Sequence, residues 1–291
     1  MKDKKVVAII GVGLIGGSMS LALKKSNYSC KTIGVEVNPF HAKTAIRLGL
    51  VDEIQDLLHA VKEADVIILA VPVDGSDTLI EGILEMVDKQ VVIDVGSTKT
   101  SVCAHASNSK NRGRFVATHP MWGTEFSGPE AAVEGAFKNK AVIICNKDES
   151  DADALQLTEE LYEHLGMHLL YMNAEAHDLH AAYVSHISHI TSFALANTVL
   201  EKEKEENAIF EMASAGFEST VRLANSTASM WVPIFKQNRE NLLDVLNEHI
   251  TQLRKFKSCL EKENYDYLFE LISHANQIKK VLDPTSNLIT Q

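Results

Sequence analysis

The segment that most constrains this chain is a short apolar run that leads into a glycine-rich turn and then into a helical pattern. Lys5–Ile10 is rich in β-branched residues, which is typical of a buried parallel strand. The turn Gly11-Val-Gly-Leu-Ile-Gly16 follows directly, and residues 18–26 have helical spacing. Strand, glycine turn and helix in this order are the fingerprint of a dinucleotide-binding unit.

Each glycine of this turn has a separate physical task. Gly11 permits the tight turn, Gly13 lets the backbone approach a pyrophosphate, and Gly16 lets the helix pack closely on the strand. The following helix presents its free N–H groups and its positive dipole end to that pyrophosphate, and Leu14 and Ile15 of the turn are assigned to the same site. We therefore expect these residues to bind the cofactor.

A second predicted strand, Lys31–Glu36, ends in an acidic residue at about the expected distance from the glycine turn, roughly 20 residues. A carboxylate there hydrogen-bonds a ribose 2′-hydroxyl and repels a 2′-phosphate, so Glu36 favours NAD over NADP. The alternative for Glu36 is a solvated strand end. Val71 and Pro72, where the strand Asp65–Val71 ends, are also assigned to the cofactor site.

Strands and helices continue to alternate as far as the predicted strand Met167–Tyr171, which implies an α/β fold with a parallel, doubly wound sheet of the Rossmann type. From residue 173 the periodicity is helical almost throughout. We predict a dinucleotide-binding domain over residues 1–172 and an all-helical domain of five or six helices over residues 173–291.

Composition excludes several classes of protein. Asp and Glu number 39 against 28 Lys and Arg, and the net charge of −11 makes nucleic acid an improbable partner. The uncharged stretch 6–23 resembles a membrane span, but its glycines and serines argue against membrane insertion. The 4 cysteines are scattered without a C-x-x-C pair, so we expect a reduced, cytoplasmic protein.

Ligands of open α/β sheets bind beyond the carboxyl ends of the strands, so the polar loops that follow strands are candidate sites. His119 follows the predicted strand Arg114–Thr118, and its imidazole can accept a proton at neutral pH. Its alternative is a structural histidine in a loop. Ser97 is suited either to orienting His119 or to capping the next helix. Glu125 is a substrate or gating carboxylate, or a surface loop residue.

The helical half carries two histidine pairs and one isolated arginine. The pairs His177/His180 and His186/His189 have the i, i+3 spacing that suggests a metal site, but no third ligand follows at a matching spacing, and we predict no metal. Arg222 lies in a weakly charged stretch, where it is suited to clamp a carboxylate, or otherwise to form a surface ion pair.

These motifs together resemble the prephenate dehydrogenase family and its arogenate dehydrogenase relatives. The resemblance covers about residues 5 to 240 in motif order, and the motifs around His119 and Arg222 are more specific than the glycine turn. It is carried by the segments 11–18, 94–99, 119–125 with Ser127-Gly128, 183–189, and 216–224 with Met230-Trp231.

The resemblance implies a substrate, a cofactor and a set of roles. The reaction is the NAD-dependent oxidative decarboxylation of prephenate to 4-hydroxyphenylpyruvate, with arogenate as the alternative substrate. His119 bonds the substrate hydroxyl, Ser97 orients His119, and Arg222 clamps a substrate carboxylate. The remaining pocket residues are His189, Thr124, Glu125, which gates Arg222, and Trp231. The family also implies a homodimer through the helical domain.

Some features depart from this pattern or leave alternatives open. Thr227-Ala228 replaces a common Asp-Pro, and Ser188 replaces a common proline, although neither change removes a proposed catalytic group. We expect no separate regulatory domain. A β-hydroxyacid dehydrogenase and a non-catalytic NAD sensor are the alternatives, and the set of His119, Ser97 and Arg222 argues against both. Inhibition by tyrosine and substrate contact by His186 stay open.

Overall fold

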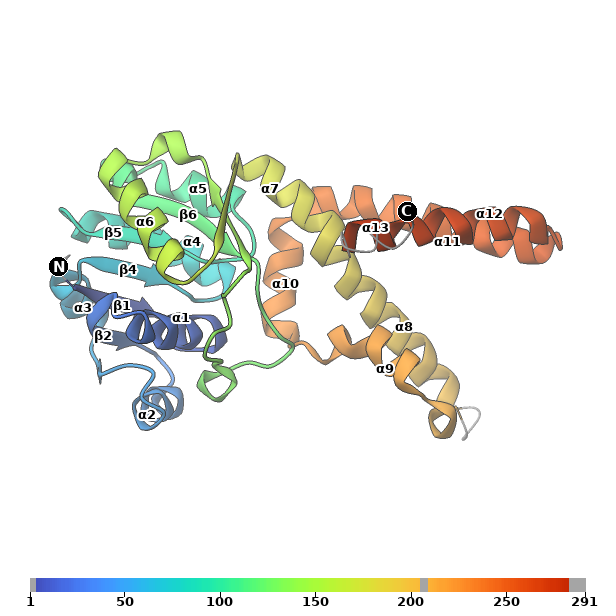
Figure 1. Ribbon diagram of the computed structural model, residues 1–291, viewed down its shortest axis with the longest axis horizontal. Coiled ribbons are helices and arrows are strands. Elements are labelled where there is room, and N and C mark those ends of the chain that lie inside the picture. Colours follow the sequence, from blue (N-terminus) through green and yellow to red (C-terminus); the bar gives the residue numbers. More distant parts are fainter. Residues whose placement is uncertain (1–3, 205–208, 283–291) are drawn as a thin grey trace, which may run out of the picture. The chain divides into compact units, whose positions relative to one another are not determined.

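The computed structural model describes residues 4–204 and 209–282 of the chain. The chain divides into two compact units, one that ends at Leu242 and one that starts at Leu243. The first unit holds an eight-stranded sheet and the helices up to α10 (Figure 1). The second unit holds most of α11 together with α12 and α13. Nowhere in the described ranges does a helix combine the length and the apolar character needed to cross a membrane.

The sheet has the strand order β3-β2-β1-β4-β5-β6-β7-β8. The order reverses between β1 and β4, where a doubly wound sheet binds ligands at its carboxyl edge. The sequence thus predicted the fold class correctly. The strands are β1 (Lys5–Ile10), β2 (Ser29–Val35), β3 (Glu53–Ile54), β4 (Val66–Leu69), β5 (Val91–Asp94), β6 (Phe115–Pro120), β7 (Ala141–Cys145) and β8 (His168–Met172).

One strand pair departs from the parallel arrangement that the alternation predicts. β6 and β7 are antiparallel, with His119 opposite Ile143, whereas the other six pairs are parallel. Two parallel neighbours need a crossover, usually an α-helix, but residues 121–140 contain only the short 3-10 helix η2 (Pro129–Ala131). Without a crossover helix, the chain reverses direction after β6, and β7 runs antiparallel beside it.

Helices cover both faces of the sheet, and the alternating side chains of the strands divide between two cores. Val7 and Ile9 face the core that contains α1, whereas Ala8 and Ile10 face the core that contains α4. The first face is covered by α1 (Leu14–Lys25) and α6 (Ala152–His164), with α2 (Pro39–Arg47) at its edge; the second is covered by α3 (Leu57–Glu63), α4 (Val73–Met86) and α5 (Thr100–Ala106).

Residues after Asn173 form helices without a described strand, as the periodicity predicts. They number more than the five or six expected, because short helices interrupt the long ones. A π-helical turn, η4 (Ala182–His186), joins α7 (Ala174–Ala181) to α8 (Ile187–Glu203). The others are α9 (Ala215–Val221), η6 (Arg222–Asn225), α10 (Ala228–Gln237), α11 (Arg239–Glu261), α12 (Tyr265–Ala275) and α13 (Lys279–Leu282). The remaining 3-10 turns are η1 (Arg112–Arg114), η3 (Lys147–Glu149), η5 (Phe210–Met212) and η7 (Asn276–Ile278).

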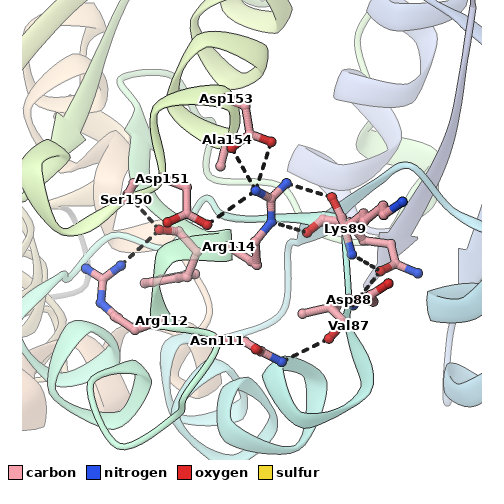
Figure 2. Close-up of polar contacts among 12 residues, drawn as sticks. Val87, Asp88, Lys89, Asn111, Arg112, Arg114, Ser150, Asp151, Asp153 and Ala154 are labelled. Carbon is pink, nitrogen blue, oxygen red and sulfur yellow. Dashed lines mark hydrogen bonds and ion pairs between the residues drawn. The ribbon is translucent and has the colours of Figure 1, made fainter.

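The amino end of β6 is held by the guanidinium of Arg114, as Figure 2 shows. Arg114 pairs with both carboxylate oxygens of Asp153, at 2.8 and 2.9 Å, at the start of α6, and it donates to the carbonyl of Lys89 at 2.6 Å. These contacts join three segments that are distant in sequence. They fix β6, the strand that carries His119, from the end opposite to the candidate site.

The glycine turn gives a direct test of packing. A Cβ atom at position 16 would lie 2.1 Å from the carbonyl oxygen of Gly11 and 2.8 Å from Ile9. We expect Gly16→Ala to lower the free energy of unfolding by about 3 kcal/mol, because backbone atoms must move. Urea unfolding followed by circular dichroism measures the change. Unfolding curves that coincide with wild type would contradict this account.

Gly82 in α4 supplies the matched control. A Cβ atom there meets no atom within 4 Å. We expect Gly82→Ala to raise the free energy of unfolding by about 0.5–1 kcal/mol, because alanine loses less conformational entropy in a helix.

Candidate active site

The glycine turn lies at the carboxyl edge of the sheet, between β1 and the N-terminus of α1. Gly11 has a φ of +91°, and a Cβ atom there would lie 2.6 Å from the carbonyl oxygen of Ala70. Around Gly13, in contrast, a Cβ atom would meet nothing within 4 Å. Gly13 is also the N-cap of α1, so the first N–H groups of that helix begin beside an open backbone. This arrangement fits the approach of a pyrophosphate.

The predicted helix start at Ser18 is wrong by one turn, because α1 begins at Leu14. Leu14 and Ile15 therefore belong to its first turn, where free N–H groups are available to a ligand. Val71 and Pro72 follow β4 on the other side of the turn. A Cβ atom on Gly11 would lie 3.0 Å from Val71, and Pro72 is the N-cap of α4.

Glu36 follows β2 directly and contacts the glycine turn. One carboxylate oxygen accepts from the backbone N–H of Val12 at 3.2 Å, and the other accepts from the N–H of Asn38 at 2.9 Å. Both bonds hold the carboxylate at the carboxyl edge of β1 and β2. The geometry therefore places a negative charge beside the predicted cofactor site.

His119 lies inside β6, which continues to Pro120, and not in a loop beyond the strand. The antiparallel pairing with β7 extends the strand past the predicted end at Thr118. His119 is half-buried, and its Nδ1 lies 2.8 Å from Nε2 of His177 on α7. Nδ1 of His177 in turn lies 2.8 Å from a carboxylate oxygen of Asp178. The three side chains form a continuous hydrogen-bonded chain.

The charge at the end of this chain determines which atoms carry protons. The ionised carboxylate of Asp178 can only accept, so Nδ1 of His177 carries a hydrogen and its Nε2 is an acceptor. Nδ1 of His119 then donates to that acceptor, which leaves Nε2 of His119 with a free lone pair. In residues 4–204 and 209–282 no protein group bonds this Nε2. It is therefore suited to accept a hydrogen from a bound hydroxyl.

Asp178 also caps α5 from a neighbouring helix. Its carboxylate accepts from the backbone N–H of Lys99 at 2.8 Å and from that of Thr100 at 2.9 Å. Of the two alternatives for Ser97, the capping of this helix is wrong, because α5 begins at Thr100 and its first N–H groups are bonded by Asp178. Ser97 is half-buried in the preceding loop, and no hydrogen bond joins it to His119 within the described part of the chain.

Burial and hydrogen bonding determine the protonation states of His119, His177 and Asp178. Burial lowers the pKa of His119 well below its usual value; protons on His177 or His186 would lower it further, as does the positive charge of Lys99. The pKa of His177 is also lowered, mainly by burial. Burial alone would raise the pKa of Asp178, but hydrogen bonds from His177 and Thr100 outweigh it and leave that pKa lowered. Both histidines are thus neutral and Asp178 is charged at pH 7.

Arg222 is paired with Glu125, which lies on the loop after His119. Nη1 of Arg222 donates to a carboxylate oxygen of Glu125 at 2.7 Å. The Arg222 side chain is 53% exposed and that of Glu125 is 14% exposed. The guanidinium is therefore accessible while its partner is largely covered. Thr124, the neighbouring residue, accepts from the N–H of Phe126 at 3.3 Å.

His189 on α8 stacks on Trp231 of α10. The ring centroids lie 3.5 Å apart at an interplanar angle of 28°. Nδ1 of His189 is 3.2 Å from the carbonyl oxygen of Ser185, so it donates there and Nε2 remains an acceptor. The pKa of His189 is lowered by burial and by the positive charge of Arg222 in η6, which together outweigh the contact with Ser185. The indole N–H of Trp231 is buried without a partner in the described chain.

Several functional candidates escaped the sequence analysis. The sequence pattern marks His177 only as half of a pair with a metal-like spacing and Lys99 only as the end of the segment 94–99, and it gives no role to Asp178 or Asn238. Asn238 donates to the carbonyl of Asp178 at 2.7 Å and lies 3.1 Å from Nδ1 of His186. The sequence contains no signal that joins them, because the contacts are long-range. Among the described residues, no group of three or more His, Cys, Asp or Glu side chains is arranged to hold a metal ion.

Comparisons with known proteins agree along almost the whole chain. The family model for the prephenate dehydrogenase nucleotide-binding domain matches residues 19–171, and the model for the dimerization domain of that family matches residues 173–274. Prephenate dehydrogenase of Bacillus subtilis is 31% identical over 283 residues, 96% of this chain and 76% of that protein. Cyclohexadienyl dehydrogenase of Zymomonas mobilis is 31% identical over 284 residues, 96% of each.

A solved structure is also similar over nearly its full length. The crystal structure of prephenate dehydrogenase from Aquifex aeolicus, in complex with hydroxyphenyl propionate and NAD+, superposes with a TM-score of 0.88. It is 29% identical and the match covers 97% of this chain and 99% of that one.

A glycine turn at the reversal point of a doubly wound sheet, together with a neutral histidine near the carboxyl end of β6 in the same sheet, is typical of a nucleotide-binding dehydrogenase. Both halves of the chain match models of one such family, and curated relatives match at 31% identity. The chain belongs to the prephenate dehydrogenase family, as the motifs in the sequence indicated.

A further buried histidine, His186, lies next to the hydrogen-bonded series of Asp178, His177 and His119, and its burial can be tested by the pH dependence of stability. Burial lowers the pKa of His186 to about 4, from 6.5 in an unfolded chain. Between these values the unfolded state binds more protons, so the stability present above pH 6.5 is lost as the pH falls toward 4. We expect His186 alone to lower the free energy of unfolding by about 3 kcal/mol between pH 7 and pH 4.

Urea unfolding at both pH values measures this loss in wild type and in His186→Phe, which keeps a ring against Trp231. The variant should lose about 3 kcal/mol less on acidification. His180→Gln, at an exposed position on α7, is the matched control and should follow wild type. Equal losses in wild type and His186→Phe would refute the assignment.

Proposed function

We propose that this protein catalyses the NAD-dependent oxidative decarboxylation of prephenate to 4-hydroxyphenylpyruvate, a step of tyrosine biosynthesis. The observation that carries the proposal is the hydrogen-bonded series of Asp178, His177 and His119, which leaves a lone pair on a neutral imidazole near the carboxyl end of β6. Membership of the prephenate dehydrogenase family supports it.

His119 is the proposed catalytic base. Its Nε2 accepts the hydroxyl proton of the cyclohexadienol while Nδ1 stays bonded to His177. The positive charge that forms on His119 is spread toward His177 and balanced by Asp178. NAD, when bound, would supply the acceptor for the hydride of the carbinol carbon. The ring carboxylate leaves as CO₂, and its bonding electrons pass through the ring to the oxygen of the former hydroxyl, which takes back the proton from Nε2 of His119. The ring becomes aromatic, which makes the step strongly downhill.

Substrate binding falls to residues around Arg222. Its accessible guanidinium is paired with Glu125, and a substrate carboxylate would replace Glu125 as its partner. This exchange keeps Arg222 paired in both states, and it gives Glu125 the gating role. His189 and Trp231 form one stacked wall of the pocket, and Thr124 lies at the loop.

Ser97 keeps its proposed place near His119. Because Nδ1 of His119 is engaged by His177, a contact from Ser97 would be made to the Nε2 side, where the substrate hydroxyl also binds.

NAD is the proposed cofactor. Gly11, Gly13 and Gly16 shape a backbone that a pyrophosphate can approach, and Leu14 and Ile15 supply N–H groups. Glu36 is held at the edge of the turn, where its charge repels a 2′-phosphate. Val71 and Pro72 form the opposite side of the site. The relative from Aquifex aeolicus was crystallised with NAD+.

Arogenate is the second candidate substrate. It differs from prephenate by an amino group in place of a keto group on the side chain, far from the hydroxyl that His119 contacts. The relative from Zymomonas mobilis is named cyclohexadienyl dehydrogenase, a term that does not specify the side chain.

We further propose a homodimer through the helical domain, with the domain boundary at residues 172/173. Two family models meet at that position, and the second is described as a dimerization domain. In the second unit, α12 exposes Tyr265, Phe269 and Ile272, which lie on one face of the helix. Light scattering of the purified protein tests the dimer, and a monomer at micromolar concentration would contradict it.

We place the enzyme in the cytoplasm, in agreement with four free cysteine thiols and no disulfide among them. Recovery of the tagged protein outside the cytoplasmic fraction of its host would contradict this.

The reaction is tested by NADH formation at 340 nm with prephenate and with arogenate. We expect turnover with prephenate, and loss of both activities would overturn the proposal. His119→Asn should lower kcat by about 10²–10⁴-fold, the usual contribution of a positioned base, with NAD binding nearly unchanged. A loss below about tenfold would remove His119 from the mechanism.

Arg222 and Glu125 should respond in different ways to substitution. Arg222→Ala should raise KM by about 100-fold, because a desolvated substrate carboxylate loses its charged partner. Glu125→Gln removes only the competitor for the guanidinium, so KM should not rise. An increase of KM in Glu125→Gln equal to that in Arg222→Ala would show that the two residues act as one unit.

A further inference from the structure

Lys99 is a fully buried lysine directly beneath the candidate site. Its side chain is 0% exposed, and its ammonium donates to the carboxylate of Asp94 and to the carbonyl oxygen of Thr118, the latter at 2.7 Å. A lysine is almost never buried to this extent without a partner. Thr118 is the residue immediately before His119 in β6, so the ammonium holds the strand at the position of the proposed base.

The backbone of the same residue reaches the other end of the histidine chain. The N–H of Lys99 donates to the Asp178 oxygen that also contacts Nδ1 of His177. From Asp178 the chain runs through His177 to His119, and the next residue back along β6 is Thr118. Lys99 therefore closes a ring of contacts that starts and ends on its own atoms.

We propose that Lys99 is a positioning residue for His119. Its ammonium fixes the carbonyl before His119, and its backbone N–H fixes the carboxylate that orients the histidine chain. This inference rests on the proposed role of His119 as the base, and it adds a residue that does not touch the substrate.

The buried ion pair of Lys99 and Asp94 carries a desolvation penalty, so a gain in folding stability does not account for its presence. Both side chains are removed from water, the Lys99 side chain being 0% exposed and that of Asp94 1%. Well-packed apolar side chains in place of a buried ion pair are often as stable or more stable. A positive charge near His119, in contrast, changes the pKa of that histidine, which an apolar side chain cannot do.

That consequence is electrostatic. The charged and titratable groups around His119 are His177 and Asp178 on α7, His186 on η4, Asp94 at the end of β5, and Lys99 at the N-cap of α5. Burial is the main cause of the lowered pKa of His119; a proton on His177 would lower it further, and the positive charge of Lys99 does so while His177 is neutral. Lys99 thus helps to keep His119 neutral, which is the state that accepts a proton.

Lys99→Met tests the proposal, and Lys99→Met/Asp94→Asn guards against a folding failure because it leaves no unpaired buried carboxylate. The matched control is Lys24→Met. Lys24 also donates to one carboxylate, that of Asp52 at 2.8 Å, and to one backbone carbonyl, that of Gly49 at 3.0 Å.

The first measurement is the pKa of His119 in the resting full-length protein, from ¹⁵N-histidine NMR with His119→Asn to assign the signal. The second is the acid limb of the pH profile of kcat/KM. In the double variant we expect both to move to higher pH by about one unit, the size of a nearby charge in a partly buried site. Lys24→Met should leave both unchanged.

An unmoved His119 pKa in the folded double variant, with activity lowered equally at all pH values, would overturn the proposal and leave Lys99 a structural residue. The NMR result does not depend on turnover. A wild-type protein inactive on prephenate and arogenate would therefore overturn the proposed function, while the shift of His119 would still decide the role of Lys99.

Discussion

One buried carboxylate, that of Asp178, organises the candidate site. It accepts from the first N–H groups of α5 and from the ring of His177, so it joins the sheet domain to the first helix of the helical region. A buried anion needs several donors, and here these donors are the elements that must be aligned. The direction of the hydrogen bonds toward His119 follows from that single charge. The lone pair that faces the site is therefore a property of the fold and not of His119 alone.

The second constraint is the path of β6. Arg114 fixes the amino end of this strand, and the ammonium of Lys99 fixes the carbonyl next to its carboxyl end. The antiparallel partner β7 holds the strand through Pro120. A histidine within a paired strand has less conformational freedom than one in a loop. Such rigidity suits a base whose position must be held within a fraction of an ångström.

The strand, turn and helix at the N-terminus were predictable because their signals are local. Gly11, Gly13 and Gly16 are required by the backbone geometry of a turn of a few residues. The β-branched runs indicate buried strands in the same local way. The start of α1 was placed one turn late, since Leu14 to Gly17 contain glycines that lower helix propensity, although the packing of Gly16 requires the helix there. The antiparallel β7 was missed because strand composition does not determine strand direction; the connection over residues 121–140, which contains no α-helix, returns the chain beside β6.

The sequence by itself determined the class of fold, the glycine turn, the family and the residues His119 and Arg222. Only the tertiary structure decided what these residues touch. His119 contacts His177 and not Ser97, and the cap of α5 comes from α7. Lys99, which the sequence marks only as the last residue of the segment 94–99, is buried and bonds the carbonyl before His119. Local patterns report propensity and periodicity over a few residues. Contacts between residues 58 or 79 positions apart depend on how whole elements pack. A buried charge destabilises the fold unless it is paired, so only the arrangement that pairs these groups is stable.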